Sequence, residues 1–483
     1  MGVRVYVFIF FVLSIIGVCY HELWLDEAHH FLLARDSNSF YELIHACRNE
    51  GHPLLWNSIL YFVTRFSPNV FYMQLVHVLI SCLTVVVISK SNLSVGEKVM
   101  IIFGYFIFYE YTIISRNYGL SALLIFLLIQ AYSKNKEALL KLSLLIFLLA
   151  NTHLYALLFF VAFVFTYIVC NRSTVFSIKP GAILTAALIV LAGWLLSVYF
   201  IMPPIAYAKK FMSYSSYGYL STERIVNTVT VCLKGLFYLP DYTAPNHHFE
   251  NSHYFLTLNL KLWVLYLLSG IAIGIPILIL RAHVFALTLF CSFLLIFSMV
   301  YFFLPLTYGA RYFGFFYLVF LACYWLARRQ VSRGWVRLSF VIFALQFING
   351  MYAYSMDICY PFSESKNMND YLKQVRIGKE NVFILDRTLR PGISAYSNEK
   401  YFGVENGALL SYCLWDTTLS DSMLKVKLDL ALNKDSSCLV VADKPVGNLL
   451  DTARLVKLKV FDNSILKGEN AVVYRYQRKA GDK

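Results

Sequence analysis

Long apolar runs, several of them 16–22 residues in length, constrain this chain more than any other feature. A helix of about 20 residues crosses the ~30 Å hydrocarbon core of a bilayer. Charged residues make up only 14% of the chain, against about 25% in soluble proteins. The sequence therefore predicts a polytopic α-helical membrane protein. We expect about eleven transmembrane helices, near residues 4–20, 70–89, 98–114, 118–133, 139–153, 155–170, 181–202, 261–280, 283–304, 312–327 and 336–353.

Basic residues in the short loops indicate how these helices are oriented. If the N-terminus is cytoplasmic, most of these Lys and Arg residues fall on the cytoplasmic side, as the positive-inside rule requires. The net charge of +14 is then explained by basic loops at the membrane and does not imply nucleic acid. Arg4 and the first apolar run resemble a signal peptide, but no small-x-small cleavage site follows, so we expect a retained first span. Eleven crossings would leave the C-terminus extracytoplasmic.

This topology divides the chain into two domains. Residues 1–355 form the membrane domain, with extracytoplasmic loops at 21–69 and 203–260, and the polar region 356–483 forms an extracytoplasmic domain. Apolar runs alternate there with a helical pattern, which predicts a small α/β domain. The expected strands lie at 382–385, 438–442, 455–461 and 471–476, and the expected helix at 422–434.

The first loop is the most unusual segment. Its acidic pair, Asp26-Glu27, follows the first span closely, where carboxylates are costly and often functional, although a solvated loop is the simpler alternative. Amphipathic patterns predict interfacial helices at 36–48, with Asp36-Ser37 as a cap signal, and at 53–66. In the second loop we expect a helix near 221–238. Its tyrosines suit either an aromatic belt or a substrate site.

Several polar residues fall at the extracytoplasmic ends of predicted spans, on the side of Asp26. Arg116 precedes the fourth span, His153 ends the fifth, and Arg311 precedes the tenth. Each has an ordinary alternative, such as an arginine that snorkels to the interface. Together with the acidic pair they describe a pocket at the lipid–water boundary, acidic on one wall and able to bind phosphate on the other. His52 could face the same pocket or be a simple cap or surface residue.

Metal and disulfide sites are weakly indicated. His29-His30 and His247-His248 are candidate ligands, but neighbouring histidines point in different directions from a helix, so we predict no metal site. The ten cysteines show no CxxC pair. Cys413 and Cys438 could pair if their domain is extracytoplasmic, which the sequence leaves open.

The motifs resemble those of the GT-C superfamily of glycosyltransferases that use polyprenyl-phosphate sugars. The most similar branch contains the protein O-mannosyltransferases, the aminoarabinose lipid A transferases and many bacterial envelope glycosyltransferases. The matching motifs are WLDEAHHF (24–31), GHPLLWNSILYF (51–62), SRNYGLSALL (115–124), NTHLY (151–155) and GARYFGFF (309–316). Two positions depart from that branch: Leu54 and Asn117 stand where it usually has proline.

The resemblance implies a fold, a location and a reaction. It suggests a GT-C-like enzyme of the bacterial cytoplasmic membrane that transfers a sugar from polyprenyl phosphate to a hydroxyl of an envelope glycan or glycolipid, such as lipopolysaccharide or O-antigen. Asp26 would be the base of an inverting displacement. Glu27, the second catalytic candidate, would orient the loop or bind the acceptor or substrate. No cofactor is required, although some relatives use a divalent metal. The expected substrate-binding residues are His52, Arg116, Tyr118, His153, Arg311 and Tyr312. A polysaccharide polymerase, or a transporter or flippase of lipid-linked glycans, is the alternative.

Overall fold

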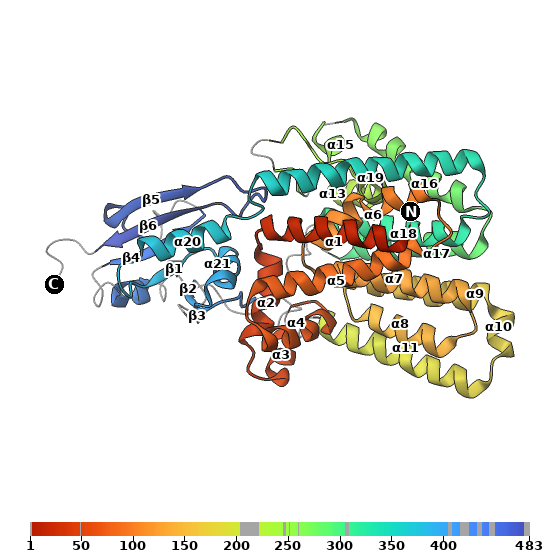
Figure 1. Ribbon diagram of the computed structural model, residues 1–483, viewed down its shortest axis with the longest axis horizontal. Helices are drawn as coiled ribbons and strands as arrows, with labels where there is room; N and C mark the ends of the chain where they lie inside the picture. Colours follow the sequence, from red (N-terminus) through yellow and green to blue (C-terminus); the bar gives the residue numbers. More distant parts are fainter. Residues whose placement is uncertain are drawn as a thin grey trace.

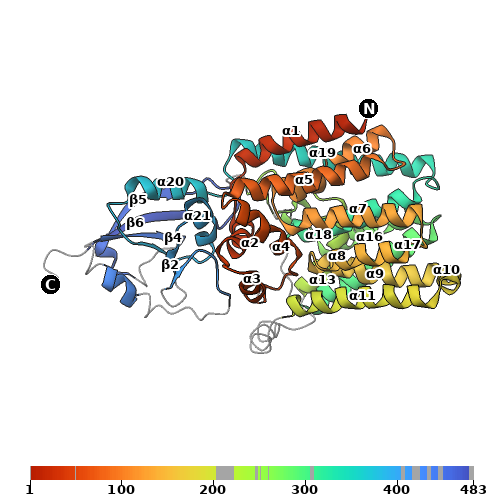
Figure 2. The ribbon, with the colours of Figure 1, turned by 60° about the horizontal axis from the view of Figure 1, so that its bottom comes forward.

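The computed structural model describes residues 2–48, 50–202, 222–244, 248–250, 252–258, 260–304, 309–403, 408–415, 425–431, 437–443 and 450–477. A bundle of helices fills one part of the molecule, and a smaller α/β domain lies beyond one end of it (Figure 1). Three short helices of the first loop lie between the two, as Figure 2 also shows. They are α2 (Leu25–Asp36), α3 (Phe40–Cys47) and α4 (Leu55–Phe66).

Seven helices of the described chain are long and apolar enough to cross a membrane. This confirms a membrane-embedded architecture, but the expectation of eleven spans is wrong. The seven are α1 (Val3–Tyr20), α5 (Val70–Ser89), α11 (Pro180–Ile201), α16 (Leu262–Leu280), α17 (Val284–Phe303), α18 (Ala310–Ala327) and α19 (Arg333–Cys359).

The other four expected spans are helical but shorter or more polar. Residues 98–114 are divided between α6 (Val95–Ile102) and the π-helix η1 (Tyr105–Ile113). The break at Gly104 packs against α19, where a Cβ on Gly350 would lie 2.8 Å from the Phe103 carbonyl oxygen. The remaining three are α7 (Asn117–Lys134), whose two ends are polar, and the short helices α8 (Leu139–Ala150) and α9 (Leu154–Cys170).

Short helices complete the membrane domain. The single helix expected near 221–238 is two helices, α13 (Thr222–Val229) and α14 (Val231–Leu236), while residues 203–221 of the same loop lie outside the described residues. Two further short helices are α10 (Arg172–Ser177) and α15 (Tyr254–Thr257). The most enclosed long helix is α18, in which 89% of the membrane-length window is buried.

The C-terminal domain is built on a mixed six-stranded sheet in the order β3-β2-β1-β4-β6-β5. All four expected strands are present, and two short ones were not expected. The strands are β1 (Val382–Ile384), β2 (Tyr401–Gly403), β3 (Leu409–Leu410), β4 (Ser437–Ala442), β5 (Leu455–Phe461) and β6 (Ala471–Gln477). Strands β1, β2 and β4 are parallel, and the other pairs are antiparallel.

Alternating side chains give this sheet two apolar faces. Val382 and Ile384 pack on one face with α20 (Ser365–Val375) and α21 (Leu389–Ser397). Phe383 packs on the other face with Leu428, which belongs to the described part, 425–431, of the expected helix. A 3₁₀ turn, η3 (Thr452–Arg454), precedes β5. Cys413 and Cys438 do not form the disulfide that the sequence allowed.

The α/β domain is joined to the first loop by specific hydrogen bonds. The Leu23 N–H donates to the Tyr396 hydroxyl at 2.8 Å, and the Leu25 N–H donates to Glu469 Oε1 at 3.2 Å. Further along, His29 Nε2 lies 2.5 Å from Glu50 Oε2, which also accepts from the Trp415 indole at 3.1 Å. The acidic segment is therefore held between the bundle and the sheet.

Candidate active site

Asp26 and Glu27 lie in the first turn of α2. The structure therefore replaces the expected loop by a helix, whose N-terminal dipole favours negative charge at these positions. The two neighbouring helices were expected, at slightly different bounds. Helix α3 is capped by Ser39, which accepts from the Glu42 N–H, rather than by Asp36-Ser37. Helix α4 buries Trp56, Leu60 and Thr64 on one face, which fits an amphipathic helix at the end of the bundle.

Two arginines meet Asp26. Arg116 is the N-cap residue of α7, and Arg311 lies in the first turn of α18. Arg116 Nη1 is 2.8 Å from Asp26 Oδ2, and Arg311 Nη2 is 3.2 Å from the same oxygen. The arginine side chains are only 2% and 12% exposed, while that of Asp26 is 25% exposed. The three residues form one charged cluster with an opening at the carboxylate.

These arginines control the charge of Asp26. Burial alone would raise the pKa of the Asp26 carboxyl, but the guanidinium groups of Arg116 and Arg311 outweigh burial and lower it. Asp26 is therefore ionised throughout the physiological pH range. A carboxylate with a lowered pKa is a weak base, and Asp26 would become more basic if the arginines took another counter-charge.

Aromatic rings form the adjoining wall. The ring of His153, the N-cap residue of α9, lies 5.2 Å from that of His52 and 4.7 Å from that of Tyr118. Tyr312 stacks parallel to His153 at 6.1 Å. Hydrogen bonds fix this arrangement, because the Asn117 side chain at the start of α7 donates to the Thr152 carbonyl oxygen at 2.8 Å. The predicted binding residues therefore lie together with Asp26.

Several polar atoms of this cluster are buried without a hydrogen-bond partner in the described part of the chain. They are His52 Nδ1, the Tyr118 hydroxyl, Arg116 Nε and Arg311 Nε. An unsatisfied buried polar group costs about 1–3 kcal/mol. Burial lowers the pKa of His52 to about 3, and nearby Arg116 adds to this shift. His52 is therefore neutral, and the cluster offers cationic and neutral donors to an anionic, hydroxyl-rich ligand.

Glu27 differs from Asp26 in surroundings and in role. It is fully buried, and its carboxylate accepts from the Ser115 N–H at 2.5 Å and lies 2.9 Å from His21 Nε2. His21 Nδ1 in turn lies 2.7 Å from Asp357 Oδ2. These contacts join the ends of α1, α2 and α19 to the residue preceding Arg116. This geometry fits a positioning role for Glu27, one of the roles that the sequence suggested, and its place among the catalytic residues stays a prediction.

Four further residues of the site, Trp24, His21, Asp357 and Glu250, were not assigned to it by sequence reasoning. The Trp24 ring lies 4.6 Å beneath the Arg311 guanidinium, a cation–π contact. His21 connects Glu27 to Asp357, as described above. Glu250, between α14 and α15, interacts electrostatically with Arg311, and burial raises its carboxyl pKa to about 8. Trp24 was visible beside Asp26 in the sequence, whereas Glu250 and Asp357 carry no motif.

Within the described residues, no three His, Cys, Asp or Glu side chains gather as a metal site would require. His29 is engaged by Glu50, and His30 Nδ1 lies 2.8 Å from Asn57 Oδ1. His247, in the second candidate pair, lies outside the described residues. Metal independence stays a prediction. Neither a protein-family model nor a curated protein matches this chain.

Proposed function

We propose that this protein is an integral membrane glycosyltransferase that moves a sugar from a polyprenyl phosphate to a hydroxyl of an envelope glycan or glycolipid. The observation that carries the proposal is the ionised Asp26 held between two nearly buried arginines at the end of an apolar helical bundle. A donor whose tail stays in the bilayer would present its phosphate at this depth. If the acceptor is an envelope glycan, the reaction takes place on the extracytoplasmic side of a bacterial cytoplasmic membrane. This agrees with the basic loops at the opposite end of the bundle, because basic loops are typical of the cytoplasmic side.

The arginines suit the phosphate. A planar guanidinium donates two parallel hydrogen bonds to a phosphate, and Arg116 and Arg311 are fixed on two different helices. Interactions with the leaving phosphate that strengthen as its charge develops lower the barrier to transfer. A sugar ring needs a stacking surface and neutral hydrogen-bond donors, and these are provided by Tyr118, Tyr312, His52 and His153.

The reaction is a single displacement. The acceptor oxygen forms a bond to the anomeric carbon while the bond from that carbon to the phosphate oxygen breaks. The acceptor proton passes to Asp26, and polyprenyl phosphate leaves with the electron pair on the side of the arginines. This geometry inverts the anomeric centre, and a positioned base contributes typically about 10²–10⁴-fold to the rate. The Glu27 carboxylate accepts a hydrogen bond from the Ser115 N–H and so positions the residue that precedes Arg116.

The test uses purified full-length protein in nanodiscs. Radiolabelled polyprenyl-phosphate monosaccharides are supplied with an envelope glycan extract, and the wild type is compared with Asp26→Asn. We expect labelled glycan with the wild type only. Transfer at the wild-type rate by Asp26→Asn would refute the assigned base. A requirement for oligosaccharide donors would instead indicate a polymerase, and movement of lipid-linked sugar across the membrane without transfer would indicate a transporter.

A further inference from the structure

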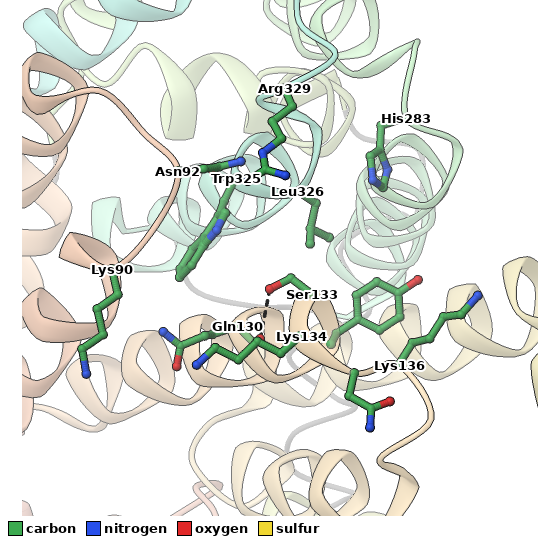
Figure 3. A pocket seen from close by; sticks show the side chains of 12 residues that line it. Lys90, Asn92, Gln130, Ser133, Lys134, Lys136, His283, Trp325, Leu326 and Arg329 are labelled. Atoms are coloured by element: carbon green, nitrogen blue, oxygen red, sulfur yellow. Dashed lines mark hydrogen bonds between the residues drawn. The ribbon is translucent and has the colours of Figure 1, made fainter.

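A cavity lies at the opposite end of the bundle from Asp26. It has a volume of 670 Å³ and is shown in Figure 3. Its lining residues come from the ends of α5, α7, α17 and α18 and from the turns beside them. They are Lys90, Asn92, Gln130, Tyr132, Ser133, Lys134, Asn135, Lys136, His283, Trp325, Leu326 and Arg329.

Two helices, α7 and α18, connect this cavity to the candidate active site. Arg116 and Arg311 stand at the N-terminal ends of α7 and α18, whereas Lys134 and Arg329 stand at their C-terminal ends. Each helix has 18 residues, which is about 27 Å at 1.5 Å per residue. This separation matches the thickness of a bilayer's hydrocarbon core. The cavity would therefore lie at the other membrane surface.

The lining of the cavity carries positive charge only. Four of its lining residues are cations, and none is acidic. In the described part of the chain, Lys90, Lys134, Lys136 and Arg329 form no ion pair with a carboxylate. The neighbouring Arg328, by contrast, is paired with Glu97 at 2.7 Å. The cations of the cavity therefore keep their charge available for a ligand.

A solvated basic surface is the simpler explanation, because cytoplasmic loops of membrane proteins are rich in lysine. Two observations favour a binding site. The cations come from three separate turns that line one hollow, and Arg329 extends toward that hollow in Figure 3. The hollow also has a mixed lining, with the largely buried Trp325 ring and the polar side chains of Gln130 and Ser133. Its volume falls within the ~300–1,000 Å³ of small-molecule pockets.

We propose that this cavity binds the phosphate group of an anionic ligand, with an acidic phospholipid headgroup as its source. Basic pockets between membrane helices are suited to such headgroups, and lysine and arginine form strong charge-assisted hydrogen bonds with phosphate. The lipid's acyl chains would remain beside the bundle. This site is separate from the proposed glycosyl-transfer site and does not depend on it.

The test is made on purified full-length protein. Native mass spectrometry measures binding of phosphatidylglycerol and phosphatidylcholine, and thermal unfolding is recorded with added pyrophosphate. Lys134→Gln/Arg329→Gln removes two exposed charges from the cavity. Arg172→Gln/Lys179→Gln removes two exposed charges from the same end of the bundle, outside the lining, and serves as the control.

We expect the wild type and the control to bind phosphatidylglycerol in preference to phosphatidylcholine. The cavity variant should bind phosphatidylglycerol at least about tenfold more weakly, because two of its four charges are lost. If no lipid preference is found but pyrophosphate raises the Tm of the wild type and control only, the phosphate site stands and its ligand is soluble. Equal responses of all three proteins to both ligands would overturn the proposal.

Discussion

Asp26→Asn separates binding from chemistry at the candidate active site. The substitution leaves Arg116 and Arg311, with side chains only 2% and 12% exposed, without their counter-charge. Breaking a buried ion pair in this way costs about 3–5 kcal/mol, and we take ~3 kcal/mol because Asp26 itself is partly exposed. The variant should therefore unfold at a lower temperature than the wild type.

The same variant should bind the lipid product more tightly. In the wild type, the phosphate of polyprenyl phosphate competes with Asp26 for both guanidinium groups. In Asp26→Asn there is no competitor, and the phosphate restores the missing charge. If the bound phosphate recovers about half of the ~3 kcal/mol lost with the Asp26 carboxylate, the variant should bind polyprenyl phosphate with an affinity about tenfold higher than the wild type. The transfer rate should nevertheless fall about 10²–10⁴-fold, because the base is absent.

Three measurements in nanodiscs test this reasoning: equilibrium binding of radiolabelled polyprenyl phosphate, thermal unfolding with and without that lipid, and sugar transfer. Asp36→Asn is the matched control, because Asp36 lies on the same helix and is ion-paired with Arg35 at 2.7 Å. We expect it to leave lipid affinity and transfer unchanged. Weaker lipid binding by Asp26→Asn would show that the two arginines are not the phosphate site.

Three other substitutions test the surroundings of Asp26. Glu27→Gln should lower the Tm and the transfer rate together, because hydrogen bonds to charged groups are worth about 1.5–3 kcal/mol each. In the same binding assay it should leave the Kd for polyprenyl phosphate unchanged. Arg116→Lys keeps the charge and loses the planar fork, so lipid binding should weaken about tenfold if one bidentate contact is lost; unchanged binding would contradict the assignment. Burial lowers the pKa of His21, but Asp357 and Glu27 raise it to about 10 overall. The charged His21 therefore contributes its full share to the free energy of unfolding below about pH 6.5, the pKa of histidine in the unfolded chain. That contribution is lost as the pH rises toward 10. Thermal unfolding against pH should show that decline, and His21→Gln should flatten it.

Helix positions were predictable where an apolar run was long and uninterrupted. The expected span 70–89 coincides with α5. The expected spans became too short where local geometry intervened, as at Gly104, where α6 ends and α19 approaches closely. The break at His153, whose extended backbone precedes α9, was expected, because the predicted spans 139–153 and 155–170 divide there. Hydropathy does not detect the close contact at Gly104, and it also counts α7, α8 and α9 as spans, although these helices are shorter or more polar than the seven membrane-length helices.

The candidate site was predictable in its members and less so in their roles. Arg116, His153 and Arg311 each begin a helix at the same end of the bundle, so the order of spans was enough to bring them together. The different surroundings of Asp26 and Glu27 depend on partners that no local pattern reveals. Glu27 contacts His21, which in turn meets Asp357, 336 residues along the chain. A sequence motif places both carboxylates and does not say which one is buried.

The lowered pKa of Asp26 argues for a particular order of events in the proposed reaction. A base is most effective when its pKa lies near the working pH, and the arginines hold Asp26 below that range when no phosphate occupies them. A donor phosphate that engages both guanidinium groups would neutralise the charge that lowers this pKa, and Asp26 would become more basic. Lipid binding and proton affinity are then linked, so donor affinity should rise as pH falls. The acceptor would consequently be activated only beside a bound donor, which limits wasteful hydrolysis of the lipid-linked sugar.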